Sequence, residues 1–137
     1  MIALLVAASP TAQQPWINAS SPTTQTLWGV ASGDTQFVAV GEGGTILTSP
    51  DGIEWTLRTS GTSRWLLAAW SPVRNLFVVV GDAGTILTSP DGITWTPRSS
   101  GTVQRLNSVA RGSRGGTVAD VFLAVVKGAL RLSRAIS

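Results

Sequence analysis

The fold of this protein is decided by the stretch Gly41-Glu-Gly-Gly-Thr-Ile-Leu-Thr-Ser-Pro-Asp-Gly-Ile-Glu-Trp-Thr56, which recurs forty residues later as Gly81-Asp-Ala-Gly-Thr-Ile-Leu-Thr-Ser-Pro-Asp-Gly-Ile-Thr-Trp-Thr96. The match extends outward, since Phe37-Val-Ala-Val40 corresponds to Phe77-Val-Val-Val80. A period of about forty residues is typical of proteins in which each repeated unit buries its apolar face against the next. The sequence therefore predicts a repeat architecture.

Each repeat contains four short segments that are rich in β-branched or aromatic residues and are bounded by Gly, Pro, Asp and Ser, as strands joined by tight turns should be. The predicted strands are Leu27–Ala31, Phe37–Val40, Thr45–Thr48 and Trp55–Arg58, followed by Leu66–Trp70, Phe77–Val80, Thr85–Thr88 and Trp95–Arg98. Four strands in about forty residues is the size of one propeller blade. We therefore predict an all-β fold, a partial β-propeller with two complete four-stranded antiparallel blades at residues 21–60 and 61–100.

The spacing of tryptophans sets the phase of the repeat and extends it in the N-terminal direction. Trp55 lies eleven residues before Leu66, and Trp95 lies eleven before Leu106. Trp16 lies eleven before Leu27, so residues 16–20 are predicted to be the outer strand of a preceding blade. The propeller region is accordingly predicted to span residues 15–110.

A third copy of the repeat begins at residues 101–110 and then decays. Within residues 111–137, Val121–Val125 and Gly128–Leu130 can be aligned with the second and third strands of a blade. This pattern predicts a degenerate third blade or tail. An amphipathic helix over Asp120–Ile136 is the alternative.

The N-terminal residues 1–14 contain an apolar run of eight residues followed by small and polar ones. This pattern resembles a truncated secretory signal, and a buried edge strand is the alternative. The run is far shorter than the roughly twenty apolar residues that span a bilayer. We predict an exported protein, periplasmic or extracellular, without a transmembrane segment.

The Ser-Pro-Asp-Gly segments are the most distinctive motif. Pro presets the backbone for a turn, the Asp carboxylate can accept backbone N–H groups, and Gly supplies a positive φ. The Trp that follows offers a large apolar face to a neighbouring strand. The candidate site residues are therefore structural turn residues, namely Ser49, Asp51, Gly52, Trp55, Ser89, Asp91, Gly92 and Trp95.

These two segments resemble the aspartate box of sialidases and related (BNR-like) propellers, although each is one residue shorter between Asp and Trp. The repeat is also similar to the units of the photosystem II stability and assembly factor family. The resemblance covers residues 16–110 and implies a propeller fold in which the boxes lie away from any active site. The second family implies protein binding as the function.

The composition restricts the chemistry available to the chain. The chain has no Cys, His or Tyr, which removes the thiolate, the commonest general base and the tyrosine nucleophile of sialidases. We predict no catalytic residue, no cofactor and no metal. The net charge of +3 comes from residues 101–137, and the repeats themselves have no basic stripe. We therefore predict that the chain does not bind nucleic acid.

The leading hypothesis is a non-enzymatic propeller module for protein binding or scaffolding, a fragment of a larger propeller, with self-association through its open blades as a further expectation. The alternatives are a fragment of an aspartate-box glycoside hydrolase and a truncated gene product without independent function. Carbohydrate is the alternative ligand, because Trp28, Trp65 and Trp70 could line a sugar-binding face. The expected role of these three residues is packing, either in the core or between blades.

Overall fold

The computed structural model describes residues 4–6, 16–71, 76–113, 120–126 and 129–134. Over these ranges the chain forms antiparallel β-sheets with two single turns of 3-10 helix, which confirms the predicted all-β class. No helix of the described residues is long and apolar enough to cross a membrane.

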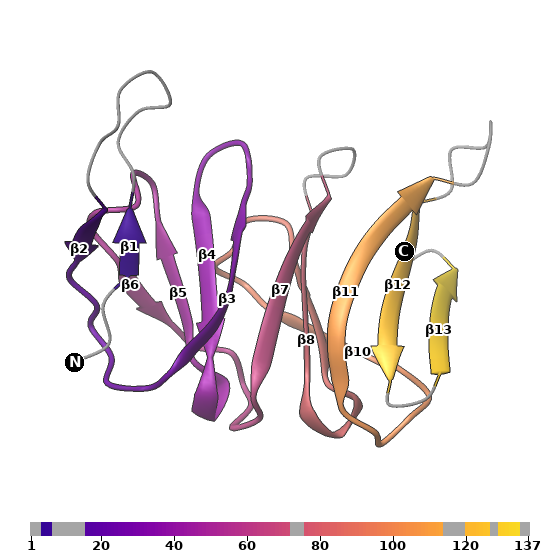
Figure 1. Cartoon of the computed structure of the whole chain (residues 1–137). Coiled ribbons are helices and arrows are strands. Elements are labelled where there is room, and N and C mark those ends of the chain that lie inside the picture. The colour runs from indigo at the N-terminus through magenta and orange to yellow at the C-terminus, as the bar shows by residue number, and fades with distance from the viewer. Residues whose placement is uncertain (1–3, 7–15, 72–75, 114–119, 127–128, 135–137) are drawn as a thin grey trace.

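Two four-stranded sheets correspond to the two full repeats (Figure 1). The first sheet has the order β3 (Leu27–Ser32), β4 (Phe37–Gly41), β5 (Ile46–Ser49), β6 (Thr56–Arg58), and the second has the order β7 (Leu66–Ser71), β8 (Leu76–Gly81), β9 (Ile86–Ser89), β10 (Thr96–Arg98). The predicted third and fourth strands begin one residue too early in both repeats. Thr45 and Thr85 end the 3-10 turns, and Trp55 and Trp95 still belong to the turns that precede β6 and β10.

The third sheet contains β11 (Leu106–Ser113), β12 (Asp120–Val126) and β13 (Ala129–Arg134) in that order. The helix considered for Asp120–Ile136 is therefore wrong. The apolar run of β12 is paired on both edges, with β11 and with β13, so its backbone groups are satisfied within a sheet.

A separate two-stranded hairpin lies at the N-terminal end of the array. Its strands are β1 (Leu4–Val6) and β2 (Ile17–Ala19), which pair antiparallel. β2 lies within the outer strand predicted at residues 16–20. β1 lies within residues 1–14, for which a truncated signal and, alternatively, a buried edge strand were predicted. The other residues of that segment are outside the described ranges.

The three larger sheets follow one another along the array and pack face to face, and the first strand of the second sheet, β7, contacts both β3 and β11 (Figure 1). The core lies between the sheets rather than within any one of them. One cluster joins the first and second sheets through Val38, Val40, Ile46, Leu66, Phe77, Val79 and Leu87. A second cluster joins the second and third sheets through Val78, Val80, Ile86, Leu106, Ala124 and Val126.

The alternation of side chains explains why the second strands are apolar throughout. Val79 faces the first sheet, whereas Val78 and Val80 face the third, and all three are at most 1% exposed. A strand buried on both faces needs apolar residues at every position.

The Gly-x-x-Gly segments at residues 41–44 and 81–84 form the turns that pack each repeat against the linker to the next. Gly44 and Gly84 have positive φ values of 72° and 69°. A Cβ atom at Gly44 would overlap the carbonyl oxygen of Thr62, and one at Gly84 would overlap that of Thr102. Glycine is required here because two backbones meet without room for a side chain.

Candidate functional site: an exposed tryptophan row

The Ser-Pro-Asp-Gly turn of the first repeat is held by its own side chains. Ser49 is fully buried and its Oγ accepts the Gly52 N–H at 2.7 Å. Asp51 Oδ1 accepts the N–H groups of Ile53 at 2.8 Å and Glu54 at 3.0 Å. Gly52 has a φ of 79°, which closes the turn.

The second turn repeats this arrangement almost atom for atom. Ser89 Oγ accepts the Gly92 N–H at 2.7 Å, and Asp91 Oδ1 accepts the N–H groups of Ile93 and Thr94, both at 2.8 Å. Gly92 has a φ of 73°. Both carboxylates are therefore engaged in turn stabilisation, as their sequence context predicts.

The two tryptophans of these turns, each predicted to be buried against neighbouring strands, are half-buried. Trp95 packs against the cluster between the first and second sheets. The indole N–H of Trp95 donates to the carbonyl of Gly92 at 3.0 Å, and that of Trp55 donates to Gly52 at 2.9 Å. This bond ties one edge of each ring to its own turn.

The turn of the second repeat also forms part of the contact between the first two sheets. The side-chain amide of Gln36, which precedes β4, donates to the carbonyl oxygen of Asp91. A Cβ atom at Gly92 would come within 3.1 Å of the Val38 side chain. The second turn is thus part of the packing between repeats.

Hydrogen bonding lowers the pKa of both turn carboxyls below the ordinary value of 3.8. For Asp51 the main cause is the backbone N–H of Ile53, and for Asp91 it is that of Thr94. Because each pKa is lower in the folded protein than in the unfolded chain, this stabilisation is present above the unfolded pKa and is lost as the pH falls through the folded pKa.

We therefore expect stability to fall as the pH drops below about 4. The double variant Asp51→Asn/Asp91→Asn should be less stable than wild type at pH 7, and the difference should shrink toward pH 2. Urea denaturation at a series of pH values measures this difference. The control is Asp34→Asn, which lies outside the two Ser-Pro-Asp-Gly turns. An equal difference at both pH extremes would contradict a role for the ionised carboxylates.

A second group of residues lies at the opposite end of the sheets, where the 3-10 turns meet the first strands. Trp28 of β3 stacks on Trp65, which precedes β7, with ring centroids 5.4 Å apart and an interplanar angle of 26°. The guanidinium carbon of Arg105, which precedes β11, lies 4.7 Å from the centroid of the Trp65 ring. We call Trp28, Trp65 and Arg105 the tryptophan row.

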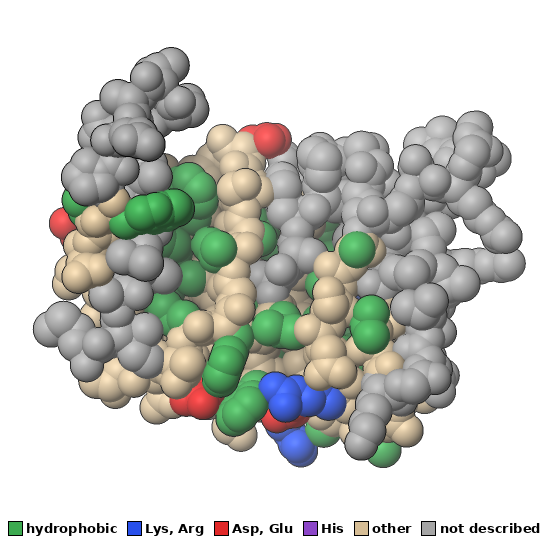
Figure 2. Space-filling model, viewed as in Figure 1, with side chains coloured by type: hydrophobic (Ala, Val, Ile, Leu, Met, Phe, Trp, Pro, Cys, Tyr) green, Lys and Arg blue, Asp and Glu red, His purple; other side chains and the backbone are tan. Residues whose placement is uncertain are grey.

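The row is exposed, and each repeat unit contributes one member. Trp28 is 50% exposed and Trp65 36% exposed. Figure 2 shows hydrophobic and basic side chains together at the lower edge of this face. Trp28 and Trp65 thus pack between repeats, one of the two roles expected of them, but they do so at the surface and not in the core. The side chain of Trp70 lies outside what the structure describes.

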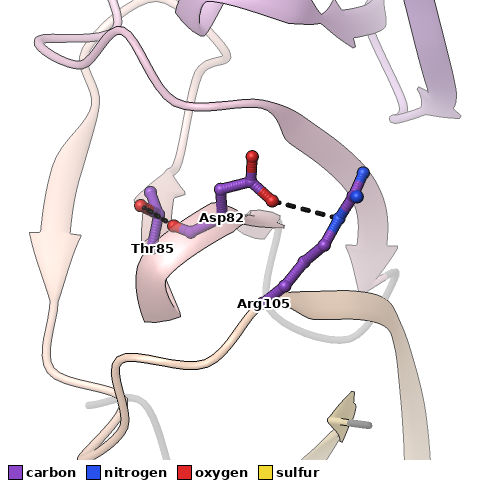
Figure 3. Close-up of polar contacts among 3 residues, drawn as sticks. All are labelled: Asp82, Thr85 and Arg105. Carbon is purple, nitrogen blue, oxygen red and sulfur yellow. Dashed lines mark hydrogen bonds and ion pairs between the residues drawn. The ribbon is translucent and has the colours of Figure 1, made fainter.

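An ion pair positions the cation of the row (Figure 3). Arg105 Nε lies 3.0 Å from Asp82 Oδ1, and Asp82 belongs to the 3-10 turn Asp82–Gly84. The hydroxyl of Thr85 donates to the Asp82 carbonyl at 2.6 Å and secures that turn. An exposed ion pair adds little to stability, but here it holds the guanidinium above the Trp65 ring.

A small cavity of about 180 Å³ lies beside the row. Its lining includes Trp28, Trp65, Arg105 and Asn107 together with Leu66 and Gly81. It offers an aromatic face, a cation and an amide to a bound group. This combination suits the capture of a flat or apolar group that carries a polar or acidic substituent.

No protein-family model, curated protein or solved structure matches this chain. Its function must therefore be argued from the geometry of its own residues. Among the described residues, no group of three or more His, Cys, Asp or Glu side chains could hold a metal ion.

Sequence reasoning named Trp28 and Trp65 as a possible sugar-binding face but missed Arg105 and the row, because the three residues occupy different positions of the repeat. Trp65 and Arg105 both precede the first leucine of a strand, but Trp28 follows the corresponding Leu27. One signal was available in β3, where Trp28 and Val30 alternate with Leu27 and Gly29 and so share the exposed face.

Proposed function

We propose that this chain is part of a non-catalytic β-propeller and that it binds a protein partner through the tryptophan row. The propeller architecture is supported by the face-to-face order of the sheets and by the contacts among their first strands. In this arrangement β3, β7 and β11 lie closest to the propeller axis, and the fourth strands lie on its outside.

The observation that carries the binding role is the exposure of a stacked aromatic pair. Trp28 and Trp65 together present a large apolar surface that a protein core would normally bury. Tryptophan and arginine are the residue types most enriched at the energetic centres of protein interfaces. Both occur here in the same row, and an ion pair already orients the arginine.

A hydrolase function has less support. Asp51 and Asp91 each accept two backbone N–H bonds from their own turns, and hydrogen bonding keeps the pKa of both carboxyls low. A glycosidase acid needs a raised pKa and a second carboxyl group across the scissile bond. The two turns belong to different repeats and serve the same structural purpose, which favours a binding module.

Peptide selection tests the proposal. A displayed random peptide library is selected on the wild-type protein, and the enriched peptides are titrated by calorimetry. We expect Trp28→Ala and Arg105→Ala each to weaken binding by about tenfold or more, because both remove contacts from the centre of the site. Ile53→Ala, which changes an exposed apolar residue in the turn at the opposite end, should leave the affinity unchanged.

Two outcomes would contradict the proposal. Peptides whose affinity is unaffected by Trp28→Ala would place the binding surface elsewhere. Binding to a glycan array that depends on Trp28, without any enriched peptide, would identify a carbohydrate-binding module instead.

A further inference from the structure

The N-terminal hairpin has the register of the outer half of a repeat. In the second sheet, Thr88 pairs with Thr96, the residue after Trp95. In the hairpin, Val6 pairs with Ile17, the residue after Trp16. The next pairs correspond as well, Leu5 with Asn18 and Leu87 with Pro97. β1 therefore occupies the position of a third strand, and β2 that of a fourth.

The third sheet provides the complementary part. Val125 pairs with Leu130 as Val80 pairs with Ile86, so β13 has the register of the third strand β9. Within the described residues, β13 has β12 on one edge and no strand on the other. The first and second sheets both have a fourth strand at that edge. β2 has the phase and direction to fill it.

The two end faces of the array are exposed at corresponding positions. Val125 is 40% exposed, whereas its counterparts Val40 and Val80 are buried at 0% and 1% by the sheet that follows. At the other end, Phe37 is 37% exposed, whereas its counterpart Phe77 is 3% exposed and packs on the preceding sheet. Both ends therefore retain surface that a neighbouring sheet covers elsewhere.

The N-terminal face is not wholly bare, contrary to the expectation of open blades at both ends. Ala39 and Leu47 are fully buried, although alternation places them on the face away from the second sheet. The β1–β2 hairpin lies on that side of the array (Figure 1). The hairpin thus stands in for the outer half of a preceding sheet.

We propose that two copies of this chain complete one another: β13 of one copy takes the place of β1 beside β2 of the other, at both ends. The proposal rests on the propeller architecture given above. Each chain then contributes two complete sheets and one shared sheet, so that two copies make six. Propellers close with about four to eight blades, and six lies within this range. One copy would supply three blades and three copies would supply nine, and both numbers lie outside it.

The exchange is favourable because β13, unlike β1, is already held along a second strand of a larger sheet. β1 has three residues, and β13 has six and is already anchored along β12. The incoming sheet also buries Val125 and Phe37, the apolar side chains left open at the two ends. An array closed in this way has no unpaired outer edge at β13.

Light scattering of the full chain tests the stoichiometry. At tens of micromolar we expect a discrete particle of about twice the 14.2 kDa of the chain. A monomer, a larger ring or an open-ended series of oligomers would overturn the proposal.

A cysteine pair tests the register of the exchange. The natural chain has no cysteine, so only the introduced thiols can react. Pro97 lies opposite Leu87 in the second sheet and has no N–H group to donate. The two residues therefore form a non-hydrogen-bonded pair of the antiparallel ladder. Asn18 has the same position in β2, opposite residue 131 of the partner, at the closer spacing of a non-hydrogen-bonded pair.

Oxidation of the variant Asn18→Cys/Arg131→Cys should therefore give covalent dimers on a non-reducing gel. Asn18→Cys/Ser133→Cys is the matched control, because its thiols lie two residues out of register and too far apart to join. Equal cross-linking of both pairs, or of neither, would contradict the proposed strand position.

Proline substitutions separate exchange from simple stabilisation by the hairpin. Hydrogen-bonded and non-hydrogen-bonded pairs alternate along an antiparallel ladder, so the pair next to Asn18, Ile17 with Val6, is a hydrogen-bonded one. Both of its N–H groups donate across the β1–β2 pair. Ile17→Pro removes a bond that β2 needs with β13, so it should raise the dimer Kd by at least about tenfold. Val6→Pro weakens only the strand that is displaced, so it should leave the dimer intact or tighten it.

If both proline variants dissociate the dimer equally, β1 is part of the interface and the exchange is wrong. Peptide binding at the tryptophan row provides an independent readout. A monomeric Ile17→Pro variant that still binds a selected peptide shows that assembly and binding are separate. Loss of peptide binding by Trp28→Ala in an intact dimer tests the binding function alone.

Discussion

Gly84→Ala is expected to destabilise the protein by about 4 kcal/mol or more, enough to unfold most small domains. Gly84 has a φ of 69°, and a Cβ atom there would overlap the backbone carbonyl oxygen of Thr102 as well as the Ser100 hydroxyl. The carbonyl belongs to the linker that leads into the third sheet and cannot move without displacing that sheet. The substitution therefore separates two repeats.

Gly101→Ala provides the matched control for this prediction. Gly101 has a φ of 68°, almost the same as Gly84, but nothing lies within 4 Å of the Cβ position. Its cost should be only the roughly 1 kcal/mol of placing a non-glycine residue in the left-handed region. Urea denaturation of the two variants compares them directly. Similar midpoints would show that the linker accommodates a methyl group and that the close approach is unimportant.

Trp95→Ala is expected to cost about 3 kcal/mol, the lower end of the range for removing a large aromatic side chain, because the ring is half-buried. The substitution removes the contact of the ring with the cluster between the first and second sheets. It also leaves the carbonyl of Gly92 without its indole donor. Thermal or urea unfolding measures the loss.

Trp95→Phe distinguishes these two contributions. The phenyl ring keeps most of the apolar contact but cannot donate to Gly92, so the cost should be about 1 kcal/mol. If Trp95→Phe is as damaging as Trp95→Ala, the hydrogen bond is the main contribution. An unchanged midpoint for Trp95→Ala would show that this tryptophan does not link the repeats.

Much of the local structure could be predicted because it depends on short-range chemistry. A Ser-Pro-Asp-Gly segment makes its own hydrogen bonds within six residues, so Asp51 and Asp91 could be assigned to turns from the sequence. Burial of the second strands on both faces could also be predicted, because a run of consecutive apolar residues is typical of such a strand. The one-residue errors at β5 and β6 arose where a turn retains a residue of strand-like type.

The tryptophan row could not be predicted, because it depends on three residues that are far apart in the sequence. Trp28, Trp65 and Arg105 become neighbours only when the first strands of three sheets lie side by side. The alternation in β3 places Trp28 on the exposed face with Val30, but no local pattern shows that Trp65 and Arg105 lie beside it. The structure places Trp28 and Trp65 between repeats at an exposed surface and not in the core.

The N-terminal segment shows the same division. The eleven-residue spacing from Trp16 to Leu27 identified an outer strand at residues 16–20, but composition alone pointed to a truncated signal for residues 1–14. β2 pairs with Leu4–Val6, a partner that no repeat pattern indicated. Strand pairing between distant segments depends on which edges are available after the sheets have stacked.

The period, the positions of the strands within each repeat and the chemistry of the turns could be read from the amino-acid sequence, because they follow from residue types a few positions apart. The tertiary structure alone decided which surfaces stay open. Val125 and Val80 have the same side chain and corresponding positions, yet one is 40% exposed and the other 1%. The difference is the presence or absence of a neighbouring sheet, because burial depends on what packs against a residue and not on its own identity.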